Sequence, residues 1–358
     1  MSDDNVPDDE PSTAGWDALS AAYTAVHHGH EEHHAHPEVN AALGGPDPLD
    51  GISIFDEGDA WHFLTFGFSE LYGKEIEDPD VSGYGFELSL RLAKEPLDDG
   101  PPGFAYHFLQ NMARYVFNTG RVVFAGDYMD LNGPIAQGRD TAIGAICIVV
   151  DPDLGVVDTP NGQVEVRQVL GITVDELSAI KRWNTLGFAE LLLQHTAKGA
   201  IDLSRNSLLD DDAFAQQVQE GSNRDGSSTG FVFCPHLAID ELDVDDGGGV
   251  RLEVGAKSVG ELMELLPGRL PFHQALHLVG DGGRLSFQAA DVSFVEQDPN
   301  NDDDGHLVSL SSADLTALLE QLRPERMKLT LRPKVLLDIE VVPTEITDAD
   351  GNVVEVIG

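Results

Sequence analysis

The sequence predicts an α+β protein built from two mixed domains, each with its own sheet and helices. Three observations lead to this prediction. Period-two apolar patterns, typical of strands, and helical periodicity both occur in each half of the chain. The two patterns do not alternate as a regular strand, helix, strand repeat. The 358 residues are enough for two sizeable cores, and a polar segment divides them.

The first sheet is predicted from the stretch between Trp61 and Leu92. Residues 61–68 are almost unbroken in apolar and aromatic side chains, which indicates a strand covered on both faces. Residues 86–92 alternate, with Phe86, Leu88, Leu90 and Leu92 on one face and Glu87, Ser89 and Arg91 on the other. This alternation predicts a half-buried strand.

The other elements of the first domain follow in chain order. Helical spacing predicts helices from Trp16, over 104–118, from the Thr173–Glu176 capping box to Trp183, and over 188–195. Further strands are expected at 52–55, 121–125, 145–150 and 164–170.

The second domain is predicted by similar signals. A capping box at Ser258–Glu261 opens a helix, and Ser311 or Ser312 caps another. Strands are expected from Leu285 toward Phe294, at 327–331 and at 335–342. The predicted boundaries are a disordered acidic tail at 1–12, a first domain at 13–204, a linker at 205–228, a second domain at 229–345 and a tail at 346–358.

The charge narrows the class of partner. The formal net charge is −42, from 63 acidic and 21 basic residues. Such a surface repels phosphate backbones, so nucleic-acid binding is not expected. The charge fits either a solvated acidic surface, as in proteins that work at high salt, or attraction to a basic partner.

Localisation and redox state follow from the termini and the cysteines. The N-terminus has no basic region followed by an apolar core, and no apolar run is long enough to cross a bilayer, so we expect a cytoplasmic protein without membrane contact. Cys147 and Cys234 make no disulfide framework. No cofactor is expected.

A histidine-rich tract at 27–38 offers the one alternative function. His30 to His34 match HExxH, in which two histidines one helical turn apart bind zinc and a glutamate acts as base, as in a metal-dependent hydrolase. The tract follows Gly29, precedes Pro37 and lacks apolar periodicity. We therefore expect a solvated loop that binds metal weakly at most. Asp127 and Asp130 could form an acid/base pair, but a solvated role is expected in so acidic a chain. Nothing specific favours an enzyme.

Several ordered motifs resemble the Suppressor of fused (SUFU) family. In the first domain they are ALGGPDPLDGISIF, FGFSELYG, SGYGFELSLRL, MARYVFNTGRVVFAGDYMDL, DTPNGQVEVRQVLGITVDEL and RWNTLGFAELL. The second domain is similar more loosely, in LLPGRLPFHQALHL, around Phe287 and in MKLTLRPKVLLDI. The chain looks like a compact microbial member, without the large insertion of the animal proteins.

The resemblance implies protein binding. Animal members sequester Gli-type transcription factors, and their two domains close on an extended peptide that adds as a strand. By position, the peptide-binding residues implied here are Tyr115, Val123 and Asp127, with Val123 replacing an aromatic residue. Microbial members are thought to act as immunity proteins against toxins. The implied partner is thus a protein, either a basic toxin domain or a regulatory protein.

The residues themselves leave other roles open. Tyr115 falls at helical spacing and could face the core. Asp127 follows Gly126 and could stabilise a turn.

Overall fold

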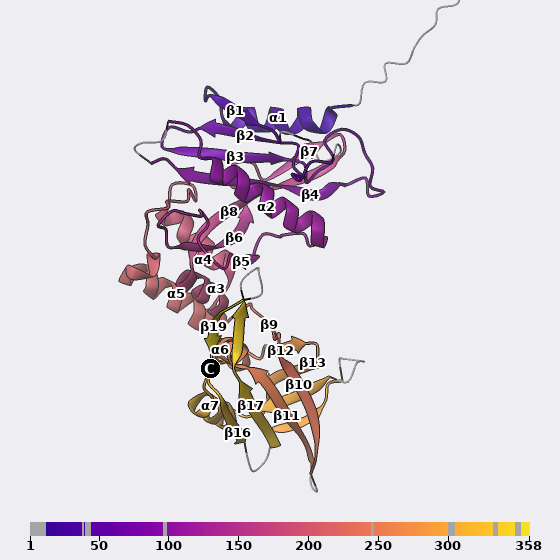
Figure 1. Cartoon of the computed structure of the whole chain (residues 1–358), viewed down its shortest axis with the longest axis vertical. Helices are drawn as coiled ribbons and strands as arrows, with labels where there is room; N and C mark the ends of the chain where they lie inside the picture. The colour runs from indigo at the N-terminus through magenta and orange to yellow at the C-terminus, as the bar shows by residue number, and fades with distance from the viewer. Residues whose placement is uncertain are drawn as a thin grey trace, which may run out of the picture. The chain divides into compact units, whose positions relative to one another are not determined.

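The chain forms two compact units in the computed structural model (Figure 1). The structure describes residues 12–37, 39, 44–95, 99–244, 247–299, 305–331, 336–347 and 352–358. The first unit comprises residues 1–178 and 185–215, and the second comprises 179–184 and 216–358. The predicted α+β class with two mixed domains is confirmed. Most of the predicted tail at 1–12 lies outside the described residues.

An eight-stranded mixed sheet forms the first unit, with β1-β2-β3-β4-β8-β6-β5 in spatial order and β7 paired to β8. All of its pairs are antiparallel except β4 with β8. The strands are β1 (Glu32–Ala35), β2 (Gly51–Asp56), β3 (Ala60–Phe66), β4 (Val81–Ala93), β5 (Tyr128–Asp130), β6 (Ile143–Val150), β7 (Val156–Thr159) and β8 (Gly162–Thr173). The described sheet therefore ends at β1 on one side and at β5 on the other.

Four helices accompany this sheet: α1 (Ala14–Val26), α2 (Gly103–Thr119), α3 (Val174–Arg182) and α4 (Thr185–His195). The capping box before α3 is confirmed. The Thr173 N–H donates to the Glu176 carboxylate at 2.9 Å, and the Glu176 N–H lies 3.4 Å from the Thr173 hydroxyl. The division into units falls within α3.

Strand β4 differs from the prediction, because both of its faces are buried. Its polar residues Glu87, Ser89 and Arg91 are 0% exposed. Burial without partners would cost several kcal/mol for each charge, so these groups must be bonded. The Arg91 guanidinium meets three carboxylates, those of Glu57 at 3.2 Å, Asp151 at 3.2 Å and Asp153 at 2.8 Å. The face of β4 that was predicted to be solvated is thus buried and holds a charge network.

The network also shifts pKa values. Burial raises the pKa of Glu57, but its bond with His27 and the Arg91 charge outweigh this and lower it to about 2. Burial chiefly lowers the pKa of His62 to about 4, so its ring is neutral near pH 7. Burial raises the pKa of Glu87 to about 7, against the opposing effect of hydrogen bonds from Ser69 and Thr65.

The second unit contains two larger sheets. A four-stranded sheet has the order β10-β11-β17-β16, and a five-stranded sheet has the order β14-β15-β13-β12-β9. The strands are β9 (Phe231–Phe233), β10 (Leu237–Val244), β11 (Gly247–Gly255), β12 (Leu276–Gly280), β13 (Gly283–Ala289), β14 (Phe294–Gln297), β15 (His306–Leu310), β16 (Met327–Leu331) and β17 (Leu336–Val342). The helices are α6 (Ala256–Arg269), η3 (Leu270–Phe272) and α7 (Ser312–Gln321).

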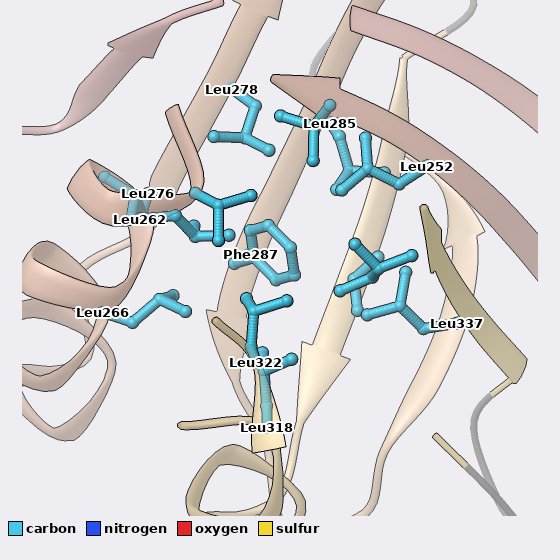
Figure 2. Packing of buried hydrophobic residues seen from close by; sticks show 14 of the residues in the cluster. Leu252, Leu262, Leu266, Leu276, Leu278, Leu285, Phe287, Leu318, Leu322 and Leu337 are labelled. Carbon is cyan, nitrogen blue, oxygen red and sulfur yellow. The ribbon is translucent and has the colours of Figure 1, made fainter. Parts of the chain in front are cut away.

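Phe287 lies in the core of this unit (Figure 2). Its ring is 0% exposed and is surrounded by leucines from strands and helices, among them Leu262 of α6 and Leu318 of α7. Both sheets and both long helices therefore share one core.

Helix caps in the second unit agree with the sequence in one case and not in the other. Ser311 caps α7, since its hydroxyl accepts from the Asp314 N–H. Helix α6 begins at Ala256 with Gly255 as its N-cap, so Ser258 and Glu261 lie inside the helix and do not form the predicted box.

The polar segment predicted as a linker at 205–228 is mostly helical. It forms η2 (Leu208–Asp210) and α5 (Asp212–Asp225). Phe214 is 0% exposed and Val218 is 6% exposed, so an apolar pair at helical spacing anchors α5. The Asp211 carboxylate accepts from the N–H of Ala213 and of Phe214.

The predicted tail at 346–358 contributes to a hairpin, β18 (Thr344–Thr347) with β19 (Val353–Ile357).

Candidate functional site

The three residues implied as a peptide site line one hollow of the first unit. Tyr115, Val123 and Asp127 border a pocket of about 410 Å³. Its floor comes from α2, β5 and β6, through Met112, Met129, Ile146 and Ile148. Residues from three separate segments thus meet at one concave surface.

Helix α2 supplies Tyr115 and ends at a glycine that turns the chain into the pocket wall. Gly120 has φ 68° and donates its N–H to the Val116 carbonyl at 2.8 Å. This left-handed C-cap favours glycine. The Tyr115 side chain is half-buried, packing on the core while bordering the hollow. Tyr115 therefore packs partly on the core, and its remaining surface borders the pocket.

The next segment is a loop and not the strand predicted at 121–125. The Asp127 carboxylate accepts from the Phe124 N–H at 2.7 Å, and the Asp127 N–H donates to the Phe124 carbonyl at 3.0 Å. Gly126 completes the turn with φ 101°. Asp127 therefore stabilises the turn while its side chain stays exposed. Val123 is only 5% exposed and belongs to the core.

Arg167 of β8 fixes this loop, a role that no sequence pattern signalled. Its guanidinium donates to the Val123 carbonyl and lies between the rings of Phe86 and Phe124, at 4.7 and 5.0 Å from their centroids. Glu165 pairs with it at 2.6 Å. A planar cation can stack and donate at once, which lysine does less well.

A second hollow continues the first along α2. It measures about 780 Å³ and shares Met112, Tyr115 and Met129 with the first pocket. It extends past Phe104 and His107 toward Ile135 and Gln137. We call the two hollows together the α2–β5 groove.

Strand β5 borders the α2–β5 groove and ends the described sheet on that side. The Leu131 N–H bonds the Gly144 carbonyl of β6 at 3.0 Å. Because backbone groups alternate in direction along a strand, the Asp130 N–H points away from β6. The groove thus combines an apolar floor, exposed carboxylates of Asp127 and Asp130, and a sheet edge.

Comparison with known proteins identifies the first unit. Residues 45–206 match the family model of Suppressor of fused protein (SUFU). The first unit belongs to the Suppressor of fused family. The SUFU match includes all of α2, the following loop and β5, and hence Tyr115, Val123 and Asp127.

Human Suppressor of fused homolog is 32% identical to this chain over 209 residues, which cover 53% of this chain and 43% of the human protein. The mouse homolog gives the same values. The match therefore spans less than half the length of these curated relatives.

Two solved structures resemble this chain. Drosophila Suppressor of Fused has a TM-score of 0.76 and 19% identity, covering 92% of this chain and 97% of that chain, which shows a shared fold. The crystal structure of the Sufu-Fu complex has a TM-score of 0.54 and 27% identity, covering 59% of this chain and 98% of that chain. No helix among the described residues is long and apolar enough to cross a membrane.

The HExxH-like tract is not helical, and the loop predicted for it is only partly confirmed. Glu32 to Ala35 form the edge strand β1. Of the two histidines of the motif, His34 lies on this strand and His30 lies in the loop before it. The His34 imidazole lies 3.2 Å from the Ser53 hydroxyl, whereas His30 contacts the Asp56 carbonyl. The one-turn spacing that a helical HExxH requires is absent here.

Proposed function

We propose that this SUFU protein is a binding module that takes an extended segment of a partner protein along the α2–β5 groove. The observation that carries the proposal is the meeting of Tyr115, Val123 and Asp127 at a hollow beside an edge strand. The Sufu-Fu complex, to which the chain is 27% identical, supports a protein partner. Such a module needs no catalytic group.

Strand addition suits the chemistry of this groove. Backbone hydrogen bonds at a sheet edge supply affinity, and pockets for alternate side chains supply specificity. The apolar floor fits aliphatic or aromatic side chains of the segment. Tyr115 offers an amphipathic ring, and the carboxylates of Asp127 and Asp130 favour basic or hydroxyl-bearing side chains.

The second unit has an edge strand of its own. Strand β9 ends the five-stranded sheet, and it carries Phe231 at 49% and Phe233 at 76% exposure. Large exposed apolar groups on an edge strand are a hazard unless another chain covers them. We include β9 in the proposal as a second place where a partner segment pairs, in keeping with the family's two-domain mode of capture.

The proposed partner is a basic protein, and neutralisation of a toxin domain in a microbial system is the specific role we propose. The net charge of −42 supports this choice, because opposite charge speeds association. Capture from a lysate of the native host, followed by mass spectrometry, tells a toxin domain from a regulatory protein. Association that slows steeply with added salt agrees with a basic partner, whereas a salt-independent rate contradicts it.

The groove itself is tested with a displayed library of random peptides selected on the full chain. The Tyr115→Ala variant should bind the selected peptides about 10-fold or more weakly, as expected for a central aromatic contact. The matched control is Phe117→Ala, which removes an exposed aromatic ring of the same helix that lies outside the α2–β5 groove. Equal binding by both variants and the parent contradicts the proposed site.

A further inference from the structure

A second candidate site lies inside the first unit, away from the α2–β5 groove. His27, Glu57 and His62 each offer one possible ligand atom, and these atoms all lie within 4.8 Å of one another. His27 follows the last residue of α1, Glu57 lies in the turn after β2, and His62 lies on β3. His27 is 2% exposed and His62 is 0% exposed. His27 belongs to the histidine-rich tract, but its two partners do not.

The three atoms lie close enough together to share one metal ion. His27 Nε2 lies 2.8 Å from His62 Nδ1, and Glu57 Oε1 lies 3.5 Å from the former and 3.8 Å from the latter. A point equidistant from the three atoms in their plane lies about 2.0 Å from each. That distance is the length of a zinc–nitrogen or zinc–oxygen bond.

Each of the three side chains is also held from behind. His27 Nδ1 lies 2.6 Å from the Tyr23 carbonyl and His62 Nε2 lies 3.5 Å from Asp151 Oδ2. Arg91 Nε lies 3.2 Å from Glu57 Oε2. Histidines that ligate metals commonly donate their other N–H to a carbonyl or carboxylate, which fixes the ring and its tautomer.

With both rings neutral, their two protons do not satisfy the cluster. The Tyr23 carbonyl requires the His27 proton on Nδ1, so Nε2 presents a lone pair to His62. If His62 donates to that lone pair, its buried Nε2 has no hydrogen-bond partner and faces the Asp151 carboxylate. If His62 donates to Asp151, two nitrogen lone pairs face one another at 2.8 Å. Each neutral arrangement lacks one positive charge at this point, which a proton or a metal ion supplies.

We propose that His27, Glu57 and His62 bind one divalent cation of the zinc class. Two neutral imidazoles and one carboxylate form an established donor set for this metal. The cation supplies the missing charge and ties the end of α1 to β3 and to the turn after β2. Glu57 is the most exposed of the three side chains, at 14%, so water completes the coordination from its side.

The test measures zinc on the full chain, purified without a histidine tag. After dialysis against a weak chelator, the parent should retain one zinc per chain and bind cobalt with visible ligand-field bands. Glu57→Gln should lower zinc affinity at least about 100-fold, since loss of an outer partner alone costs about 10–100-fold. This variant should still fold, because its amide can donate to the two imidazole lone pairs.

Two further variants complete the test. His62→Asn should also lose zinc. The matched control replaces His28, His30 and His36, which are exposed histidines of the same tract, with glutamine. The control should retain zinc with the parental affinity. The proposal is overturned if the parent holds no stoichiometric zinc, if Glu57→Gln binds as tightly as the parent, or if the control alone loses the metal.

Discussion

The guanidinium of Arg167 donates to the carbonyl oxygen of Val123 and so holds one wall of the α2–β5 groove. The two residues lie 44 positions apart in the sequence. The bond joins the central strand β8 to the loop between α2 and β5. Substitution of Arg167 should therefore affect both the stability of the first unit and binding in the groove.

We expect Arg167→Met to lower the free energy of unfolding by about 1.5–3 kcal/mol, the contribution of a hydrogen bond from a charged group. Peptide binding should weaken as well, because the wall loses its support. Urea unfolding and the selected peptides measure the two effects. Arg167→Lys keeps the charge without the planar fork and should fall between the parent and Arg167→Met. If Arg167→Met matched the parent in unfolding free energy and in peptide affinity, the loop would hold its shape without this bond.

Substitution of Arg91 should be far more severe. Arg91→Met leaves the Asp151 carboxylate, which is 0% exposed, without its cation. Breaking a buried pair in this way costs about 3–5 kcal/mol. The control is Arg114→Met, which removes a partly exposed pair with Asp47 and should cost about 0–1 kcal/mol. Similar unfolding midpoints for the two variants would argue against the charge network.

Glu87 should make stability depend on pH. Its folded-state pKa of about 7 lies above the ordinary value of 4.5. The stability it contributes is therefore fully present below about pH 4.5 and is lost as the pH rises through 7. Glu87→Gln cannot ionise. The unfolding free energy of the parent should thus fall relative to that of Glu87→Gln as the pH is raised from 5 to 8.

The glutamine can be accommodated in this site. Its amide can donate to the Thr65 hydroxyl, which lies 3.2 Å from the Leu88 carbonyl and can donate to it in turn. Glu190→Gln, at an exposed position on α4, is the control and should show the parental pH dependence. Matching pH profiles for parent and Glu87→Gln would contradict the assignment.

The core of the second unit offers a stability test that is independent of the groove. Phe287→Ala removes a ring that is 0% exposed and should cost about 3–5 kcal/mol. Phe233→Ala, at 76% exposure, should change stability little. Amide hydrogen exchange should show the loss within β11, β12, β13 and β17. Loss confined to the first unit would contradict the observed division of the core.

Apolar periodicity predicted the fold class and the longer strands of the first sheet, β2, β3, β4, β6 and β8, because burial of an apolar face is a local signal. It did not indicate β10, β11 and β12 of the second unit. It could not predict that β4 is buried on both faces. The partners of Arg91 and Glu87, such as Asp151 and Ser69, are distant in sequence. A polar face with remote partners looks the same as a solvated face.

The errors near the site and in the linker have similar causes. Residues 121–125 have strand-like composition, but the side chains of Asp127 and Arg167 bond their backbone and hold a loop. Helix α5 was hidden by its polar composition, although Phe214 and Val218 at helical spacing could have indicated it. The triplet of His27, Glu57 and His62 is assembled only by the folded chain.

The central claim is strand addition at β5, and its most direct test removes one outward-facing N–H. Asp130→Pro deletes this donor, and proline is tolerated on an edge strand. Asp130→Asn keeps the N–H and removes only the charge. Measured by calorimetry with a selected peptide, Asp130→Pro should abolish detectable binding while Asp130→Asn retains it. Parental affinity in a folded Asp130→Pro protein would contradict strand addition at β5.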